Sequence, residues 1–266
     1  MRRDIAAAIV ITAAILAGLA AIGNGGWPGE PSGCIEAGDC YCEAFTGGLV
    51  EQPANTFSNL GFVAVGLWVL TLAGRPAAGR NLIADDTRIS RLYGWIAIGL
   101  GVGSMLFHGT MTEWGGWADL VSMYAFITFF LLYEVRTRRN AGAAWLLQIW
   151  IFANLVLATF QWFADNGIGK VVFAALIVGT LTANLRVVAP RSGPPRALRN
   201  QRLFWTGLAA YVVGNVIWML SRTGGVLCEP DSILQGHAVW HLTSAAAVAV
   251  FFLYLRSEVP AEVRRG

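Results

Sequence analysis

Long stretches with very little charge dominate this 266-residue sequence. A stretch of about 20 apolar residues crosses ~30 Å of hydrocarbon as a helix that rises 1.5 Å per residue. Such a stretch must be helical in lipid, because only a helix satisfies its own backbone polar groups there. The sequence therefore predicts seven membrane-spanning helices, at roughly 55–74, 89–108, 118–135, 143–161, 167–186, 203–221 and 236–255.

The composition supports the same fold class. Hydrophobic residues make up 56% of the chain and charged residues only 13%, and the mean hydropathy is +0.56. A soluble domain of this length would cover its surface with more charge. The formal net charge is only +3 and no basic aromatic stripe is present, which argues against nucleic-acid binding. We expect an all-α protein, a polytopic membrane helix bundle.

An additional apolar run, from Ile5 to Gly23, follows Arg2 and Arg3 near the N-terminus. It is longer than the roughly 7–15-residue apolar region of a signal peptide, and no clean small-x-small cleavage site follows it. An uncleaved anchor is therefore favoured over a signal peptide, although both remain open. The expected organisation is an N-terminal hydrophobic segment at 1–23, an acidic cysteine-containing segment at 24–54, a seven-helix transmembrane domain at 55–256 and a C-terminal tail at 257–266.

The distribution of arginine predicts the orientation in the membrane. Arginines fill the connections 75–91, 134–142 and 186–202, and basic residues mark the cytoplasmic side. The segment 24–54 has acidic residues but no Lys or Arg, and the connections 109–117, 162–166 and 222–235 are nearly free of basic charge. These segments should lie outside, on the periplasmic face of a bacterial-type inner membrane.

All four cysteines, Cys34, Cys40, Cys42 and Cys228, fall in segments expected outside. An oxidising compartment allows disulfides there. Four cysteines permit three pairings, and the sequence does not choose among them or exclude free thiols.

The only three histidines of the chain are expected at one depth in the membrane. His237 and His241 are four residues apart, so they share one face at the outer start of the last helix. His108 ends the second helix, which runs outward. Three imidazoles with an open fourth position are typical of a catalytic zinc site. The alternative is that each histidine is a separate interfacial residue with its own hydrogen bonds.

Two other polar residues are expected near this level. Ser104 lies one turn before His108 on the same helix face, and Asp119 opens the third helix. Polar groups in hydrocarbon are costly and usually have a partner. Ser104 could also be a packing residue, as serine often is in membrane helices, and the Gly99–Gly103 pair more often indicates close helix packing than chemistry.

Together these residues resemble the alkaline ceramidase family. The resemblance rests on Cys42-Glu43, on Asn-Thr-Phe-Ser-Asn at 55–59, on Ser104-x-x-x-His108 with Asp119 eleven residues later, and on His237-x-x-x-His241. It covers the chain from about residue 40 to the end. It implies that the three histidines bind zinc, that Asp119 handles protons and that Ser104 steadies an oxyanion.

The resemblance has further implications for the outer segment. It implies a disulfide between Cys42 and Cys228, which leaves Cys34 and Cys40 for each other. This sequence differs from the calcium site of the family, because Gln52 stands where a Glu is expected. Glu43 is a candidate calcium ligand at its matching position, and Asp39 and Glu51 could substitute by one-residue shifts. An ordinary acidic surface explains the three carboxylates equally well.

The expected function is zinc-dependent hydrolysis of the amide bond of ceramide or a related N-acyl lipid, with the substrate entering from the bilayer. A fatty acid and a sphingoid-like amine would be the products. The alternatives are a zinc-containing receptor or sensor without significant turnover, and an ion that only joins helices. Asp119 and the open fourth position favour the enzyme, because a structural ion needs no base. The sequence does not identify protein partners or the oligomeric state.

Overall fold

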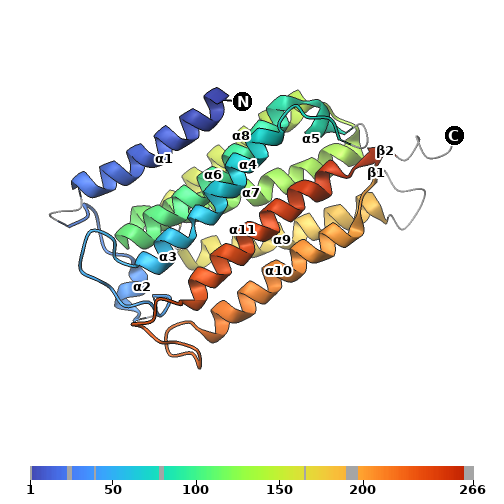
Figure 1. Ribbon diagram of the computed structural model, residues 1–266. Helices are drawn as coiled ribbons and strands as arrows, with labels where there is room; N and C mark the ends of the chain where they lie inside the picture. Colours follow the sequence, from blue (N-terminus) through green and yellow to red (C-terminus); the bar gives the residue numbers. More distant parts are fainter. Residues whose placement is uncertain are drawn as a thin grey trace.

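The protein is an elongated bundle of long helices that lie side by side (Figure 1). The computed structural model describes residues 2–22, 26–38, 40–77, 81–164, 166–189 and 197–260. Within these ranges, seven helical stretches are long and apolar enough to cross a membrane. The chain is therefore an integral membrane protein with the predicted fold class.

The elements follow one another along the chain with short connections. In order they are α1 (Arg2–Ile22), α2 (Gly33–Glu36), α3 (Pro53–Ser58), α4 (Leu60–Leu72), α5 (Leu82–Asp85), α6 (Thr87–Thr110), α7 (Glu113–Arg139), α8 (Ala143–Phe163), α9 (Asn166–Val188), β1 (Ala197–Leu198), α10 (Gln201–Leu220), α11 (Gly236–Arg256) and β2 (Val259–Pro260). The seven predicted spans agree with these helices to within a few residues.

The largest difference concerns α7, which begins at Glu113 rather than at 118 and ends at Arg139 rather than at 135. Local hydrogen bonds explain the longer helix. The Thr112 side chain accepts from the backbone N–H of Gly115 and caps the start, and Asn140 ends the helix in the left-handed conformation with φ of 52°. A window of apolar residues does not detect such caps, because they lie beyond its edges.

The first predicted span consists of two helices, α3 and α4, which join at Asn59. Around this residue two backbone bonds span three residues instead of four, from Asn59 N to Thr56 O and from Phe62 N to Asn59 O. The Asn59 side chain also donates to Asn55 O over 2.8 Å. The tighter turn occurs within the polar 55–59 stretch, the part of this span that faces the histidines.

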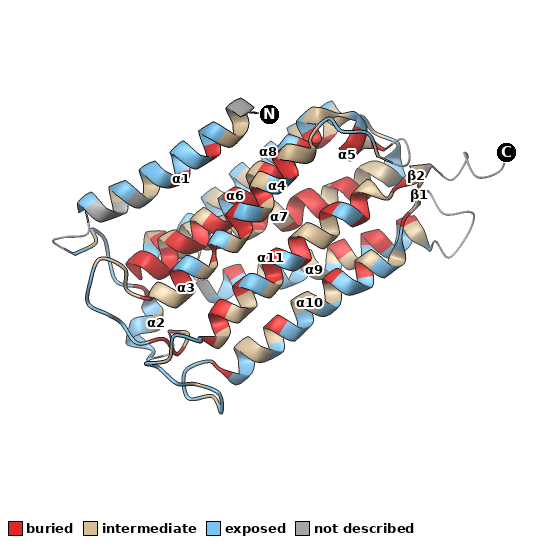
Figure 2. Ribbon diagram, viewed as in Figure 1, coloured by how far each residue is buried: buried red, intermediate tan, exposed pale blue. Residues whose placement is uncertain are grey.

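Helix α6 lies at the centre of the bundle and packs against both α4 and α7. Helices α8 and α9 pack on α7, and α10 packs along α11. Buried residues concentrate on α6, α7 and α11, whereas α8 and α10 carry many exposed residues (Figure 2). Large apolar side chains on these two helices, such as Phe152 and Val213, are exposed, as expected for helices that face hydrocarbon.

The N-terminal apolar run forms α1, which lies along the bundle (Figure 1). Its Ala8 is buried in a small apolar cluster with Leu70 of α4 and Ile98 of α6. Whether this segment is a retained anchor or a cleaved leader stays a prediction.

A buried ion cluster joins three segments at the end of the bundle opposite the histidines. Arg199 lies just before α10. Its guanidinium contacts the carboxylates of Glu134 near the end of α7 and Glu258 just after α11. Its Nε donates to Glu258 Oε2 over 2.8 Å, and Asn184 of α9 also donates to Glu134. Strands β1 and β2 pair antiparallel beside it, with Leu198 opposite Val259. The cluster therefore fixes how α7, α10 and α11 meet.

We expect Arg199→Met to destabilise the protein strongly. Removing one partner of a buried ion cluster leaves an uncompensated charge and costs about 3–5 kcal/mol. The thermal unfolding midpoint of purified protein should fall well below that of the wild type. Arg202→Met, which alters an exposed arginine in the first turn of α10, is the matched control and should leave the midpoint unchanged. Equal midpoints for the two variants would show that the cluster does not hold these segments.

Candidate metal centre

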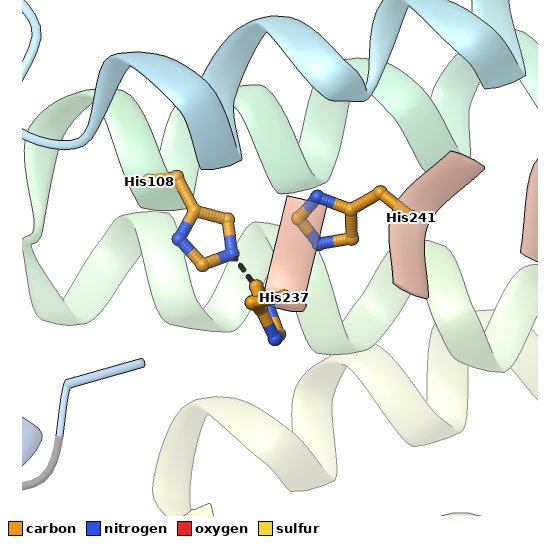
Figure 3. Close-up of side chains that lie close together, drawn as sticks. All are labelled: His108, His237 and His241. Atoms are coloured by element: carbon orange, nitrogen blue, oxygen red, sulfur yellow. Dashed lines mark hydrogen bonds between the residues drawn. The ribbon is translucent and has the colours of Figure 1, made fainter. Parts of the chain in front are cut away.

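The three histidine side chains lie close together (Figure 3). His108 lies in the last turn of α6, and His237 and His241 lie in the first two turns of α11. All three are at most 3% exposed. One ring nitrogen from each lies within 4.8 Å of the others, and no second group of three potential metal ligands occurs among the described residues.

A short turn between α6 and α7 places His108 at this level. Met111 ends α6 in the left-handed conformation with φ of 50°, and Thr112 already caps α7. The two helices then run back along each other in close contact. A Cβ on Gly115 would lie 2.8 Å from Thr110 Oγ1, and one on Gly103 would lie 2.7 Å from Ala118 O. Small residues thus permit the helix approach that the site requires.

The hydrogen bonds of the histidines leave suitable nitrogens for a metal. Nε2 of His108 and Nε2 of His237 face each other at 3.1 Å. Nε2 of His241 is buried and has no hydrogen-bond partner among the described residues. A buried polar atom without a partner costs free energy, which a bound cation would recover. Three neutral imidazole nitrogens at this spacing fit zinc, which prefers nitrogen ligands in tetrahedral sites.

His241 is oriented by the break between α3 and α4. Ser58 Oγ lies 2.8 Å and Asn59 Nδ2 lies 3.2 Å from His241 Nδ1. Ser58 donates its only hydroxyl proton to Asn55 O, so its oxygen is left to accept from His241 Nδ1. The contact with Ser58, which is the shorter of the two, therefore favours the tautomer of His241 that carries its proton on Nδ1, and Nε2 keeps a free lone pair. In metal-binding histidines, a hydrogen bond from the ring nitrogen that does not bind the metal commonly orients the ring.

Aromatic rings enclose His237. The Tyr41 ring lies 4.3 Å from the His237 ring, and the Trp218 and Trp240 rings lie 5.5 and 5.1 Å from it, all measured between ring centroids. Tyr41 also contacts His108, and its backbone has a φ of 65°. These rings restrict the orientation of His237 and exclude water from one side of the site.

Asp119 of α7 interacts with Ser104 of α6, which lies one helical turn before His108. The Ser104 side chain hydrogen-bonds Asp119 across the close contact between α6 and α7. Ser104 is buried and Asp119 is partly buried. Asp119 is not part of the three-residue ligand group. The Asp119 carboxylate is therefore separate from the candidate ligands, and it interacts with Ser104, which lies one helical turn before His108.

The stretch that carries Cys34, Cys40 and Cys42, called the outer segment after its predicted position, has two disulfides, and one of them joins it to this end of the bundle. Cys34 pairs with Cys40 and Cys42 pairs with Cys228, which confirms the pairing that the resemblance implies. The second bond joins the outer segment to the connection between α10 and α11. Cys42 N also donates to Thr223 Oγ1 in that connection.

The three candidate calcium ligands have different surroundings. The buried Glu43 carboxylate accepts from Ala54 N and Asn55 N over 2.6 and 2.8 Å and so caps α3. Burial raises the pKa of the Glu43 carboxyl, and these two N–H donors counter part of that shift. Glu51 accepts from Gly47 N, and Asp39 lies outside the described residues. Calcium binding therefore stays a prediction.

Sequence reasoning missed the partners of the histidines. Ser58 was noted only as part of the 55–59 motif, and Gln52 only because it differs from the family's calcium site. No role was predicted for Tyr41. The available signal was the polar 55–59 stretch inside an apolar span, because such groups in a membrane require partners. The contacts of Gln52 and Tyr41 depend on the path of a loop, which periodicity does not predict.

Comparison with known proteins agrees with this geometry. The family model described as Ceramidase matches residues 45–261. The matched part contains all seven helical stretches that are long enough to span a membrane, and it contains the three histidines. No curated protein matches the chain. Because the match covers most of the sequence, the chain belongs to the ceramidase family.

Proposed function

We propose that the protein is a zinc-dependent membrane hydrolase that cleaves the amide bond of ceramide or a related N-acyl lipid. The observation that carries the proposal is the convergence of three buried imidazole nitrogens, with Ser104 one helical turn before His108 and interacting with Asp119. Membership of the ceramidase family supports the choice of an amide-bearing lipid.

His108, His237 and His241 would hold the zinc through their Nε2 atoms. Zinc bound there would supply a Lewis acid for the carbonyl oxygen and a water molecule that is acidic enough to react near neutral pH. Three protein ligands leave a fourth position for the reaction, which distinguishes a catalytic site from a closed structural one.

Asp119 would move the protons of the reaction. Its carboxylate takes a proton from the attacking water as the new carbon–oxygen bond forms, and then gives that proton to the nitrogen as the carbon–nitrogen bond breaks. Protonation is required because an amide anion is a poor leaving group. The products are a fatty acid and a free amine.

The Ser104 hydroxyl would hydrogen-bond first to Asp119 and then to the oxyanion. In the resting site its hydroxyl holds the Asp119 carboxylate. Rotation about its side-chain bond would let it donate to the negative charge that develops on the carbonyl oxygen. The lipid chains of the substrate would stay in the apolar surroundings while the amide reaches this polar end.

We further propose that the site faces the periplasm. A reporter fused within 186–202 should be cytoplasmic and one fused within 222–235 should be external, because arginines are retained on the cytoplasmic side. Accessibility of the two reporters to an impermeant reagent in intact cells measures this. The reverse result would place the metal centre on the cytoplasmic side.

The purified protein should contain about one zinc per chain, and the double replacement of His237 and His241 by Ala should remove it. One remaining imidazole cannot hold the ion tightly. Elemental analysis of the purified proteins measures the ratio. Ser244→Ala, which changes a buried residue further along α11, is the control and should retain the zinc. Full zinc content in the double variant would disprove the assigned ligands.

Replacing Asp119 by Asn should leave zinc bound, because all three histidines remain. Amide turnover should fall by ~10²–10⁴-fold, the usual loss when a general base is removed. Zinc content and hydrolysis of N-acyl lipids should be measured on the same preparations. Glu113→Gln, in the first turn of the same helix, is the control and should keep wild-type turnover.

Other results for Asp119→Asn would exclude the assigned role. Zinc loss together with activity that added zinc restores would make Asp119 a ligand or an orienting group. Wild-type turnover would remove Asp119 from the mechanism. If wild-type protein binds zinc but hydrolyses no N-acyl lipid or ester, the receptor or structural alternative holds.

A further inference from the structure

Gln52 is a fully buried residue that lies between the outer segment and the metal centre. It directly precedes Pro53, the first residue of α3, and its side chain is 0% exposed. Its backbone N–H donates to His108 O over 3.1 Å, and its backbone oxygen accepts from Thr56 N over 2.8 Å. The main chain of Gln52 thus already joins the end of α6 to the start of α3.

The Gln52 side chain contacts both the outer segment and a candidate ligand. Its Nε2 donates to Cys40 O over 2.7 Å and to Glu43 O over 3.0 Å. Its Oε1 lies 2.9 Å from His108 Nδ1 and also accepts from Asn55 Nδ2 over 3.3 Å. Every one of these partners is buried or belongs to the backbone, so the amide has little freedom to rotate.

These contacts fix the protonation of His108 without reference to a metal. Backbone carbonyls only accept hydrogen bonds, so Cys40 O and Glu43 O require the NH₂ group of Gln52 on their side. The amide oxygen must then face His108. Because that oxygen also only accepts, His108 carries its proton on Nδ1, and Nε2 keeps a free lone pair that points toward His237.

We propose that Gln52 is the positioning residue for His108, and that it transmits the position of the disulfide-bonded outer segment to the metal centre. The inference rests on the proposed function only in taking His108 as a zinc ligand. The two ends of the Gln52 amide would then have separate roles. The amide oxygen orients the ligand, and the amide NH₂ holds the outer segment.

Two substitutions separate these roles. Gln52→Met removes both the acceptor and the donors at nearly the same volume. Gln52→Glu keeps an acceptor for His108 Nδ1 but cannot donate to the two carbonyls. Both variants should unfold at a lower temperature than wild type, since each leaves buried carbonyls without partners.

The zinc affinities of the two variants should differ. The zinc dissociation constant, measured by competition with a chelator, should rise ~10–100-fold in Gln52→Met, the usual effect of losing an orienting partner. It should change only a few-fold in Gln52→Glu. Zinc binding as tight as wild type in Gln52→Met, or an equal loss in both variants, would overturn the proposal.

Gln235 provides a matched control for a purely structural glutamine. It is also buried, precedes α11 and donates to three backbone carbonyls of an outer connection, those of Glu229, Pro230 and Ser232. Among the described residues, its side-chain hydrogen bonds go to these backbone carbonyls and not to a histidine side chain. Gln235→Met should therefore lower the unfolding temperature but leave the zinc dissociation constant near that of wild type. A 10-fold or larger loss there would mean that any loosened loop weakens the site.

A spectroscopic test on wild-type protein does not depend on whether the variants fold. The chain has only three histidines, so ¹⁵N-histidine labelling gives few signals to assign. In metal-free protein, His108 should show a proton on Nδ1 and none on Nε2. A proton on Nε2 would refute the proposal. Wild-type protein that binds zinc but lacks amidase activity would refute the proposed function alone, because neither readout uses a substrate.

Discussion

Three imidazole rings buried in an apolar helix bundle must find partners, and much of this structure follows from that requirement. A buried polar nitrogen without a hydrogen bond is costly, more so where neighbouring helices face hydrocarbon. Ser58 satisfies His241, Gln52 satisfies His108, and aromatic rings enclose His237. One nitrogen of each ring converges on the others, so one cation could bind all three rings.

The two ends of the bundle solve the problem of buried polarity differently. At the Arg199 end, one guanidinium pairs with two carboxylates of opposite charge. At the histidine end no carboxylate belongs to the group of converging ring nitrogens, and the Asp119 carboxylate interacts with the Ser104 hydroxyl. The first arrangement holds helices together, whereas the second leaves electron pairs available. That difference supports placing the chemistry at the histidine end.

Much of the fold and part of the candidate metal centre could be predicted from the sequence, because they depend on periodic patterns. Apolar windows predicted the seven spans, and the i, i+4 spacing of His237 and His241 placed both on one face of α11. The family resemblance supplied the disulfide pairing, which spacing alone left open among three choices. The roles of Gln52 and Tyr41 could not be predicted, because each depends on how residues 40–52 fold back over α6. The polar 55–59 stretch indicated that partners were needed but not which ones.

Zinc K-edge X-ray absorption on the purified wild-type protein tests the central claim most directly, because it reports the atoms bound to the ion. The account predicts one zinc with three nitrogens at about 2.0–2.1 Å and one further light atom, the open position occupied by water. A shell that contains sulfur, a shell with fewer than three histidine nitrogens, or protein that binds no zinc would contradict it.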